Sequence, residues 1–157
     1  MLDELFARLR EATAPAEIEA LQDGIWQIWL TAGHPVLDKR LENGMRALSA
    51  DEYTLAIQEF TFLIEAAPEY AEGWNKRATA YYLRGEYKAS LRDARQVLRR
   101  EPRHFGALWG LAIMHRMLGD ARGALRYLTR LEQLCPAWPG LQTQLRTLRN
   151  GLREGPG

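Results

Sequence analysis

Cysteine and histidine are scarce in this chain of 157 residues, which contains one cysteine and three histidines. A single thiol, Cys135, excludes an intramolecular disulfide and a cage of thiolates around a metal ion. The three histidines form neither a His-x-x-His nor a His-Glu pattern that would indicate a metal site. We therefore expect no metal and no other cofactor, and a fold stabilised by packing of apolar side chains.

Long uninterrupted apolar runs are also absent, beginning with the N-terminal stretch MLDELFARLREATAP. Asp3, Glu4, Arg8, Arg10 and Glu11 interrupt this stretch, so it matches neither a signal peptide nor a membrane span. We expect a cytoplasmic protein, with the periplasm as the alternative if a leader has been removed. The 46% apolar and 26% charged residues suit a globular protein with a sizeable core rather than a disordered chain.

A repeat of fixed length organises most of the sequence. Pro68, Pro102 and Pro136 follow one another at intervals of 34 residues. When the chain is aligned on these prolines, three units appear, each with two apolar-periodic runs separated by a short break. The runs cover residues 37–49 and 52–66, 71–84 and 87–100, and 105–118 and 121–134. They contain no proline and have apolar residues at helical spacing, so each unit is predicted to be a helical hairpin.

The breaks within the units contain residues suited to ending one helix and starting the next. Gly85 and Gly119 favour a left-handed turn after the first helix. Asp51 and Asp120 are predicted to cap the second helix. Small residues recur where the two helices should lie close together: Gly44, Ala78 and Ala112 on the first helices, and Ala56, Ser90 and Ala124 on the second.

The second unit resembles a tetratricopeptide repeat, and the other two units share its small residues and its proline. The resemblance rests on Trp74, Ala78, Tyr81, Gly85, Tyr87, Ser90, Ala94 and Pro102. Arg40 and Leu108 replace the leading tryptophan in the first and third units. The resemblance implies an all-α fold: a right-handed α-solenoid of three hairpins with a helical pair before them and a capping helix after them. Stacked hairpins of this kind cover one another's apolar faces.

The predicted organisation has five segments. Residues 1–36 form an N-terminal helical extension, a degenerate hairpin packed on the first repeat, and the alternative is that it folds into the groove. Residues 37–70, 71–104 and 105–138 are the repeats. Residues 139–157 form the capping helix, with Leu141, Leu145, Leu148 and Leu152 as its apolar stripe, and a disordered end, EGPG.

Catalytic groups are not predicted. His115 takes the place that Tyr81 has in the preceding unit, which favours a buried core histidine. His104 precedes a helix and is expected to be a capping or surface residue. Cys135 stands beside Pro136 without a neighbouring histidine, so we do not expect a nucleophile. The chain is predicted not to be an enzyme; the opposite would require a metal or a reactive thiol.

A binding groove is the better prospect. In a stack of hairpins the first helices line the concave side, so their outward residues face a ligand. The best candidates are Leu41, Met45, Asn75, Lys76, Thr79, Tyr82, Trp109, Ile113 and Arg116, with Asp38, Leu48, Glu72 and Met117 beside them. The mixture suits an apolar or amphipathic segment of another protein. The alternative is that the capping helix covers Trp109 and Ile113.

The resemblance also implies a comparison with a ligand clamp. Some members of the family hold a chaperone's terminal carboxylate with lysine, asparagine and arginine side chains. The matching places in this chain are Leu41, Met45, Lys76, Gly106 and Gly110. Most of the clamp is missing, so acidic chaperone tails are not the expected ligand.

Charge is divided unevenly along the chain. Residues 1–75 contain 5 basic and 14 acidic residues, whereas residues 76–157 contain 16 basic and 6 acidic. Two basic ridges are predicted on the second helices: Lys88, Arg92, Arg95 and Arg99, and Arg122, Arg126 and Arg130. They are simply solvated, or they bind an acidic protein, a second copy of the chain through its acidic half, or a phosphate backbone. Nucleic acid is the least favoured, because no aromatic residues are interleaved in the ridges.

The sequence as a whole predicts a protein-protein interaction module, a scaffold or adaptor that binds a partner peptide or helix in its concave groove. The alternative is a binder of acidic protein or nucleic acid through the basic ridges.

Overall fold

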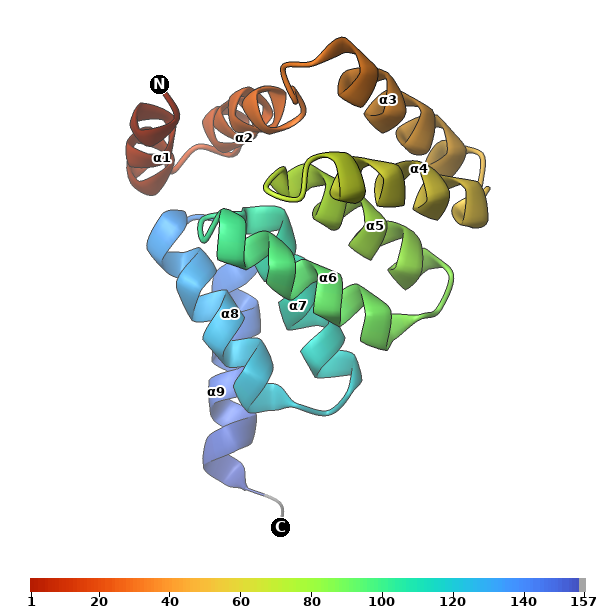
Figure 1. Cartoon of the computed structure of the whole chain (residues 1–157). Helices are drawn as coiled ribbons and strands as arrows, with labels where there is room; N and C mark the ends of the chain where they lie inside the picture. Colours follow the sequence, from red (N-terminus) through yellow and green to blue (C-terminus); the bar gives the residue numbers. More distant parts are fainter. Residues whose placement is uncertain (156–157) are drawn as a thin grey trace. The chain divides into compact units, whose positions relative to one another are not determined.

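The computed structural model describes residues 1–155 and shows helices joined by short loops (Figure 1). In chain order they are α1 (Leu2–Glu11), α2 (Pro15–Trp29), α3 (Pro35–Ser49), α4 (Tyr53–Ala66), α5 (Ala71–Leu83), α6 (Tyr87–Arg100), α7 (Phe105–Met117), α8 (Ala121–Leu134) and α9 (Leu141–Glu154). Residues 1–155 contain no β-strand, so the prediction of an all-α fold is confirmed. Within the same residues, no helix combines the length and the apolar character needed to cross a membrane.

Helix ends agree with the sequence periodicity to within about two residues. The largest difference is the start of α3, which begins at Pro35 rather than at residue 37. His34 explains the two extra residues, because its ring Nδ1 accepts a hydrogen bond from the backbone N–H of Val36 at 3.3 Å. Proline in the first turn fits this start, since the first backbone N–H of a helix has no partner within the helix.

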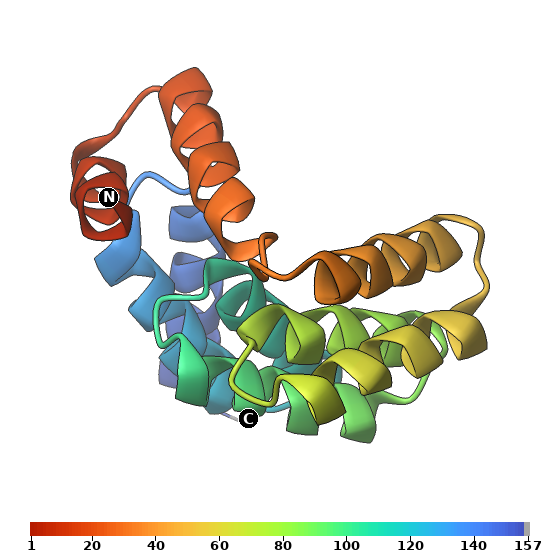
Figure 2. The same cartoon turned by 45° about the horizontal axis from the view of Figure 1, so that its top comes forward.

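The chain divides into two compact units. We call residues 29–107 the central unit and residues 1–28 with those from 108 onward the terminal unit. In the central unit α3 packs on α4, α4 on α5, and α5 on α6, as two successive hairpins (Figure 2). In the terminal unit α8 packs against α9 and also against α1 (Figure 1). The contact of α1 with α8 joins segments far apart in the sequence, and the repeat pattern does not predict it.

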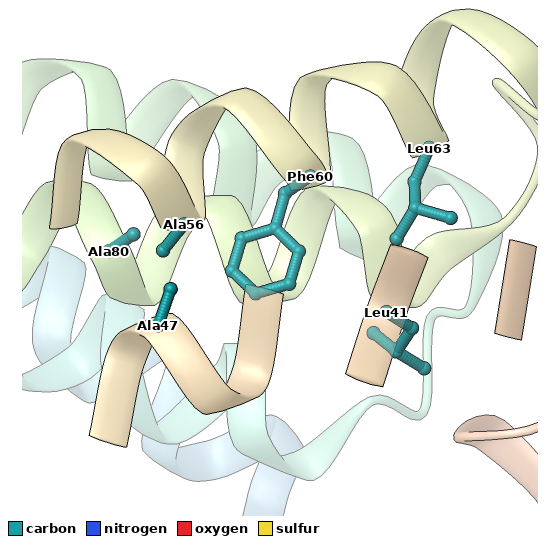
Figure 3. Close-up of a cluster of buried hydrophobic side chains, with 6 residues drawn as sticks. All are labelled: Leu41, Ala47, Ala56, Phe60, Leu63 and Ala80. Carbon is teal, nitrogen blue, oxygen red and sulfur yellow. The ribbon is translucent and has the colours of Figure 1, made fainter. Parts of the chain in front are cut away.

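The core of the first hairpin depends on one glycine. Phe60 is fully buried in a cluster formed by α3, α4 and α5 (Figure 3). The members of the cluster are Leu41, Ala47, Ala56, Phe60, Leu63 and Ala80. A Cβ atom on Gly44 would overlap the Phe60 ring, so only glycine lets α3 approach this side chain. The predicted close contact of small residues is confirmed here.

The turns between paired helices follow the repeat, with one correction. Gly85 and Gly119 have φ angles of 85° and 77°, as predicted for left-handed turns. Asp51, which precedes Gly85 by one period, also has a positive φ of 59°. It therefore takes the glycine's place in the first turn instead of capping α4, whose N-cap residue Glu52 makes no side-chain cap bond. Aspartate tolerates this conformation better than most residues.

Asp120 behaves as the sequence predicts. Its carboxylate Oδ1 accepts a hydrogen bond from the backbone N–H of Gly123 at 2.8 Å and so caps α8. One of the N–H groups without a partner in the first turn of the helix is thereby satisfied.

Only part of the apolar stripe of α9 is buried. Leu141 and Leu145 are fully buried, Leu148 is half-buried, and Leu152 is 36% exposed. Glu154, the first residue of the expected disordered end EGPG, is the last residue of α9, so the prediction is wrong for this residue. Pro156 and Gly157 lie outside the described residues.

Candidate functional site

Four of the groove candidates belong to α3 and α5 of the central unit. These two helices contact each other directly. Met45, Lys76 and Tyr82 are half-buried, and Thr79 is exposed. The Tyr82 ring meets the Tyr87 ring edge to face, with centroids 5.5 Å apart. These four side chains comprise a thioether, an aromatic ring, an ammonium group and a hydroxyl. The Thr79 hydroxyl donates to the Asn75 backbone carbonyl at 3.1 Å and keeps its acceptor capacity.

Two other candidates in this unit do not face solvent. Leu41 is 3% exposed and belongs to the core cluster around Phe60, so its assignment to a ligand-facing surface is wrong in this structure. The reason is that α4 and α5 both lie against α3, which leaves the Leu41 side chain inside. Asn75 is 9% exposed, and its Nδ2–H donates to Glu72 Oε2 at 3.2 Å. Its amide supports a neighbour instead of being open to a ligand.

Glu72, also predicted to face the groove, is buried beside His104. The carboxylate is 1% exposed and the imidazole is fully buried. The backbone N–H of Ala107 donates to His104 Nδ1 at 3.1 Å, so this nitrogen carries no proton. The proton is therefore on Nε2, which donates to Glu72 Oε1 at 2.5 Å. His104 is thus a capping residue, as predicted, but it is not a surface residue.

Aromatic rings enclose this pair. The Trp29 ring stacks on the His104 ring, with centroids 4.2 Å apart and planes 11° apart. The hydroxyl of Tyr70 donates to the backbone carbonyl of Trp29 at 2.8 Å. Burial raises the pKa of Tyr70 well above its ordinary value, and the negative charges of Glu72 and Asp38 raise it further. This cluster links Trp29 at the end of α2, Glu72 at the start of α5 and the turn before α7.

A largely buried ion pair fixes the hairpin of α5 and α6. Arg77 donates from Nε and Nη2 to the carboxylate of Asp93 at 2.6 and 3.0 Å. Its Nη1 also donates to the Thr61 hydroxyl on α4 at 3.2 Å. Burial lowers the pKa of Arg77, but the bonds and charge of Asp93 outweigh this and hold it above its ordinary value. The guanidinium therefore stays charged and ties three helices together.

Sequence patterns contain little sign of these two pairs. Glu72 and His104 are 32 residues apart, and Arg77 and Asp93 are 16 apart. A helical wheel of α5 gives no reason for Glu72 to be buried. The one local signal is the place of His104 directly before a helix.

Two of the three groove candidates of the terminal unit, Trp109 and Arg116, contact its C-terminal part. The Trp109 ring lies 6.2 Å from the ring of Trp138, and the Arg116 guanidinium donates to the Gln144 side chain on α9. Trp109 and Ile113 are half-buried. Trp138 lies before α9, so this ring contact leaves the alternative, in which the capping helix covers Trp109 and Ile113, as a prediction.

His115 is a core histidine, as expected. It is 7% exposed, and its Nδ1 lies 2.8 Å from Asp120 Oδ2. The backbone N–H of Gly123 and the bond to His115 hold the pKa of Asp120 below its ordinary value. A Cβ atom on Gly123 would overlap both the Asp120 carboxylate and His115 Nδ1. Glycine at this place lets the pair form.

The thiol of Cys135 is fully buried, and burial raises its pKa. A raised pKa lowers the thiolate fraction at neutral pH, so this thiol is a poor nucleophile. Within residues 1–155, no three histidine, cysteine, aspartate or glutamate side chains are grouped as metal ligands.

The basic ridges lie on the helices for which they are predicted, one on each unit. Lys88, Arg92, Arg95 and Arg99 are all exposed along α6 of the central unit. Asp93 approaches one of them, with its carboxylate 4.0 Å from Arg92 Nε. On α8 of the terminal unit, Arg122 and Arg126 are exposed and Arg130 is half-buried.

Comparison with known proteins agrees with this geometry. A family model described as Tetratricopeptide repeat matches residues 41–91 and 76–140. A TPR repeat-containing protein of Rhizobium etli is 30% identical over 151 residues, which cover 96% of this chain and 74% of the relative.

Solved structures with low sequence identity share the fold. The Sgt2 TPR domain from Aspergillus fumigatus is 23% identical, with a TM-score of 0.65, covering 79% of this chain and 83% of that one. The first TPR of Spaghetti (RPAP3), bound to the HSP90 peptide SRMEEVD, is 20% identical, with a TM-score of 0.66. That match covers 71% of this chain and 89% of the other.

Proposed function

Because this chain belongs to the tetratricopeptide repeat family, we propose that it is a non-catalytic interaction module that binds a segment of a partner protein. The proposed site is the face of α3 and α5 in the central unit, at Met45, Lys76, Thr79 and Tyr82. We propose the repeat boundaries 37–70, 71–104 and 105–138 for the three hairpins. On the terminal unit by itself, we propose Trp109, Ile113 and Arg116 of α7 as further contact residues.

The observation that carries the proposal is the frame beneath this face. Glu72 and Arg77 stand on the same helix as Lys76, Thr79 and Tyr82, and both are held in buried ion pairs or hydrogen bonds. A helix fixed in this way loses little freedom when a ligand binds. Binding energy is then not consumed in ordering the site.

The chemistry of the face favours an apolar or amphipathic segment. A methionine and a tyrosine offer adaptable apolar surface, while Lys76 and Thr79 provide polar groups that orient a ligand. The RPAP3 domain was solved with the HSP90 peptide SRMEEVD, which shows that this fold can hold an acidic peptide. Three of the five places of a carboxylate clamp are Met45, Gly106 and Gly110 here, and a fourth, Leu41, is buried. A different ligand chemistry is therefore expected.

Peptide selection tests the proposal, because random peptides sample many ligand chemistries at once. Peptides displayed on phage are selected on the immobilised wild-type chain, and the enriched peptides are measured by fluorescence anisotropy. The groove variant Thr79→Glu with Tyr82→Ala should bind at least about tenfold more weakly, since an aromatic anchor typically contributes more than about 1.4 kcal/mol. The ridge variant Arg95→Ala with Arg99→Ala is the matched control and should bind as the wild type does. Equal affinity of groove variant and wild type would refute the site.

A second candidate function uses the ridge on α6. Its four basic side chains are all exposed, which favours an acidic protein surface as the partner. Binding through the ridge should weaken steeply with added salt and fall on reversal of Arg95 and Arg99 to glutamate. Peptides that bind equally well at low and high salt would argue against it.

A further inference from the structure

The outward face of α4 in the central unit is partly apolar and acidic. Leu55 and Phe62 lie seven residues apart on one side of the helix and are 43% and 36% exposed. Glu52 lies one turn before Leu55 and is exposed, and Glu59 lies one turn after it. We call these four residues the α4 stripe.

This stripe is peculiar to the first hairpin. One period later, the place of Leu55 is taken by Ala89, and two periods later by Gly123. The place of Phe62 is taken by Gln96 and then by Arg130. Repeat packing therefore does not require large apolar side chains at these positions, which leaves their exposure in α4 unexplained by the fold.

Leu55 stands between two surface depressions. One has a volume of about 410 Å³ and is lined by Asp51, Glu52, Tyr53, Thr54, Leu55, Gln58 and Arg84. The other has a volume of about 350 Å³ and is lined by Asn43, Arg46, Ala47, Ala50, Glu52, Leu55 and Glu59. The two arginines of these depressions are each paired with a carboxylate, Arg46 with Glu42 and Arg84 with Glu86. Glu52 lines both depressions. An apolar side chain with a basic neighbour would fit this surface.

The two carboxylates of the α4 stripe differ in how accessible they are to a partner. Arg40 Nη1 donates to both Glu59 carboxylate oxygens at 3.2–3.3 Å and its guanidinium lies 4.2 Å from the Phe62 ring centroid. The Glu59 side chain is 14% exposed, so Glu52 is the more accessible carboxylate. The apolar side chain and the acceptor are thus one turn apart, at Leu55 and Glu52.

The same chain carries a complementary surface on α9 of the terminal unit. Leu152 is 36% exposed. Arg149 lies one turn before it and Arg153 directly after it, and both are exposed. These arginines line a depression of about 230 Å³ with Gln142, Arg146 and Asn150. Arg149 has a partner at longer range, Glu132, at 3.6 Å.

We propose that two copies of this chain associate through the α4 stripe of one copy and the face of α9 around Leu152 of the other. When Leu55 meets Leu152, Glu52 comes within reach of an arginine in either relative direction of the two helices. The two surfaces differ, so the contact is heterologous, and each copy in a pair keeps one unused α4 stripe or one unused α9 face. Self-association of this kind is separate from the peptide site on α3 and α5.

The contact is weak and depends on salt. Its ion pairs are exposed, so each adds little to the free energy of association. Their attraction is screened as ionic strength rises. Sedimentation velocity on the full chain should show a weight-average sedimentation coefficient that rises with concentration at low salt. The association constant should fall at least about tenfold between about 50 mM and about 500 mM NaCl.

Paired variants decide whether these two surfaces are responsible. The α4 variant is Glu52→Lys with Leu55→Gln, and the α9 variant is Leu152→Gln with Arg153→Glu. All four positions are exposed, so both variants should fold, as circular dichroism can verify. Each variant alone should remain monomeric. The control, Lys88→Glu with Arg95→Glu on α6, reverses exposed charges elsewhere and should associate as the wild type does.

Mixing the two variants gives the sharpest test. The α4 variant retains a wild-type α9 face and the α9 variant retains a wild-type α4 stripe, so the mixture should form a 1:1 complex. The proposal is overturned if the wild type stays monomeric at low salt, if the mixture does not associate, or if the α6 control also abolishes association. Association of the wild type that survives both variants would place the interface elsewhere and equally overturn it.

Discussion

The central and terminal units each contain a histidine paired with a carboxylate, and the two pairs are built differently. In the central unit, His104 and Glu72 come from segments 32 residues apart and are both buried. In the terminal unit, His115 and Asp120 are five residues apart, and the Asp120 side chain is 47% exposed. The first pair joins distant parts of the fold, whereas the second fastens a single turn. Removal of one partner should therefore lower the free energy of unfolding more in the central unit than in the terminal unit.

The largest effect is expected for His104→Ala. Glu72 would stay buried but lose its main donor, and Trp29 would lose its stacking partner. The unsatisfied buried carboxylate and the cavity left by the ring should together cost about 3–5 kcal/mol of unfolding free energy. Urea unfolding followed by circular dichroism measures this loss. His115→Ala is the matched variant and should cost clearly less; an equal or larger cost would invalidate the comparison.

An intermediate effect is expected at the two crowded glycines. The new methyl group of Gly44→Ala would meet the ring of Phe60, which is fully buried and cannot move aside. Such overpacking costs about 1–3 kcal/mol. In Gly123→Ala the methyl group would meet His115 Nδ1, which is buried, and the Asp120 carboxylate, which can swing into solvent, while alanine also favours the helix. Thermal unfolding of both variants should show the larger loss for Gly44→Ala, and the reverse order would contradict this account of the two sites.

The smallest effect concerns pH. Because the pKa of Asp120 is lowered in the folded protein, its ionised form contributes stability that is present above the pKa of the unfolded chain. That stability is lost as pH falls through the folded pKa, in the acid range below about 4. Unfolding free energies of the wild type and Asp120→Asn should therefore differ at neutral pH and converge in acid. If the difference between the two unfolding free energies grew as pH fell, the assignment of a lowered pKa to Asp120 would be contradicted.

Local rules in the sequence predict the helices well. The period of 34 residues, the glycines at 85 and 119, and the cap at Asp120 all depend on neighbours within one turn or on the repeat itself, and the structure confirms them. The cap predicted at Asp51 is wrong because aspartate suits both a helix cap and a left-handed turn. Its place one period before Gly85 favours the turn.

Side-chain partners from distant segments cannot be predicted in the same way. The position of Leu41 on the first helix indicates the groove, but α4 and α5 enclose it. Glu72 is on the same helix as the exposed Thr79, yet it is buried against His104. Leu152 continues the apolar stripe of α9 without being covered to the same extent as Leu141. In each case burial depends on which other helix lies alongside, and periodicity within one helix does not contain that information.

Chemical-shift mapping tests the proposed binding face most directly. A peptide selected on the wild-type chain is titrated into isotopically labelled protein, and backbone amide shifts are followed by NMR. The account predicts that the largest changes fall on α3 and α5, around Met45, Lys76, Thr79 and Tyr82. Changes confined to the outer faces of α4 or α6, with α3 and α5 unaffected, would contradict it.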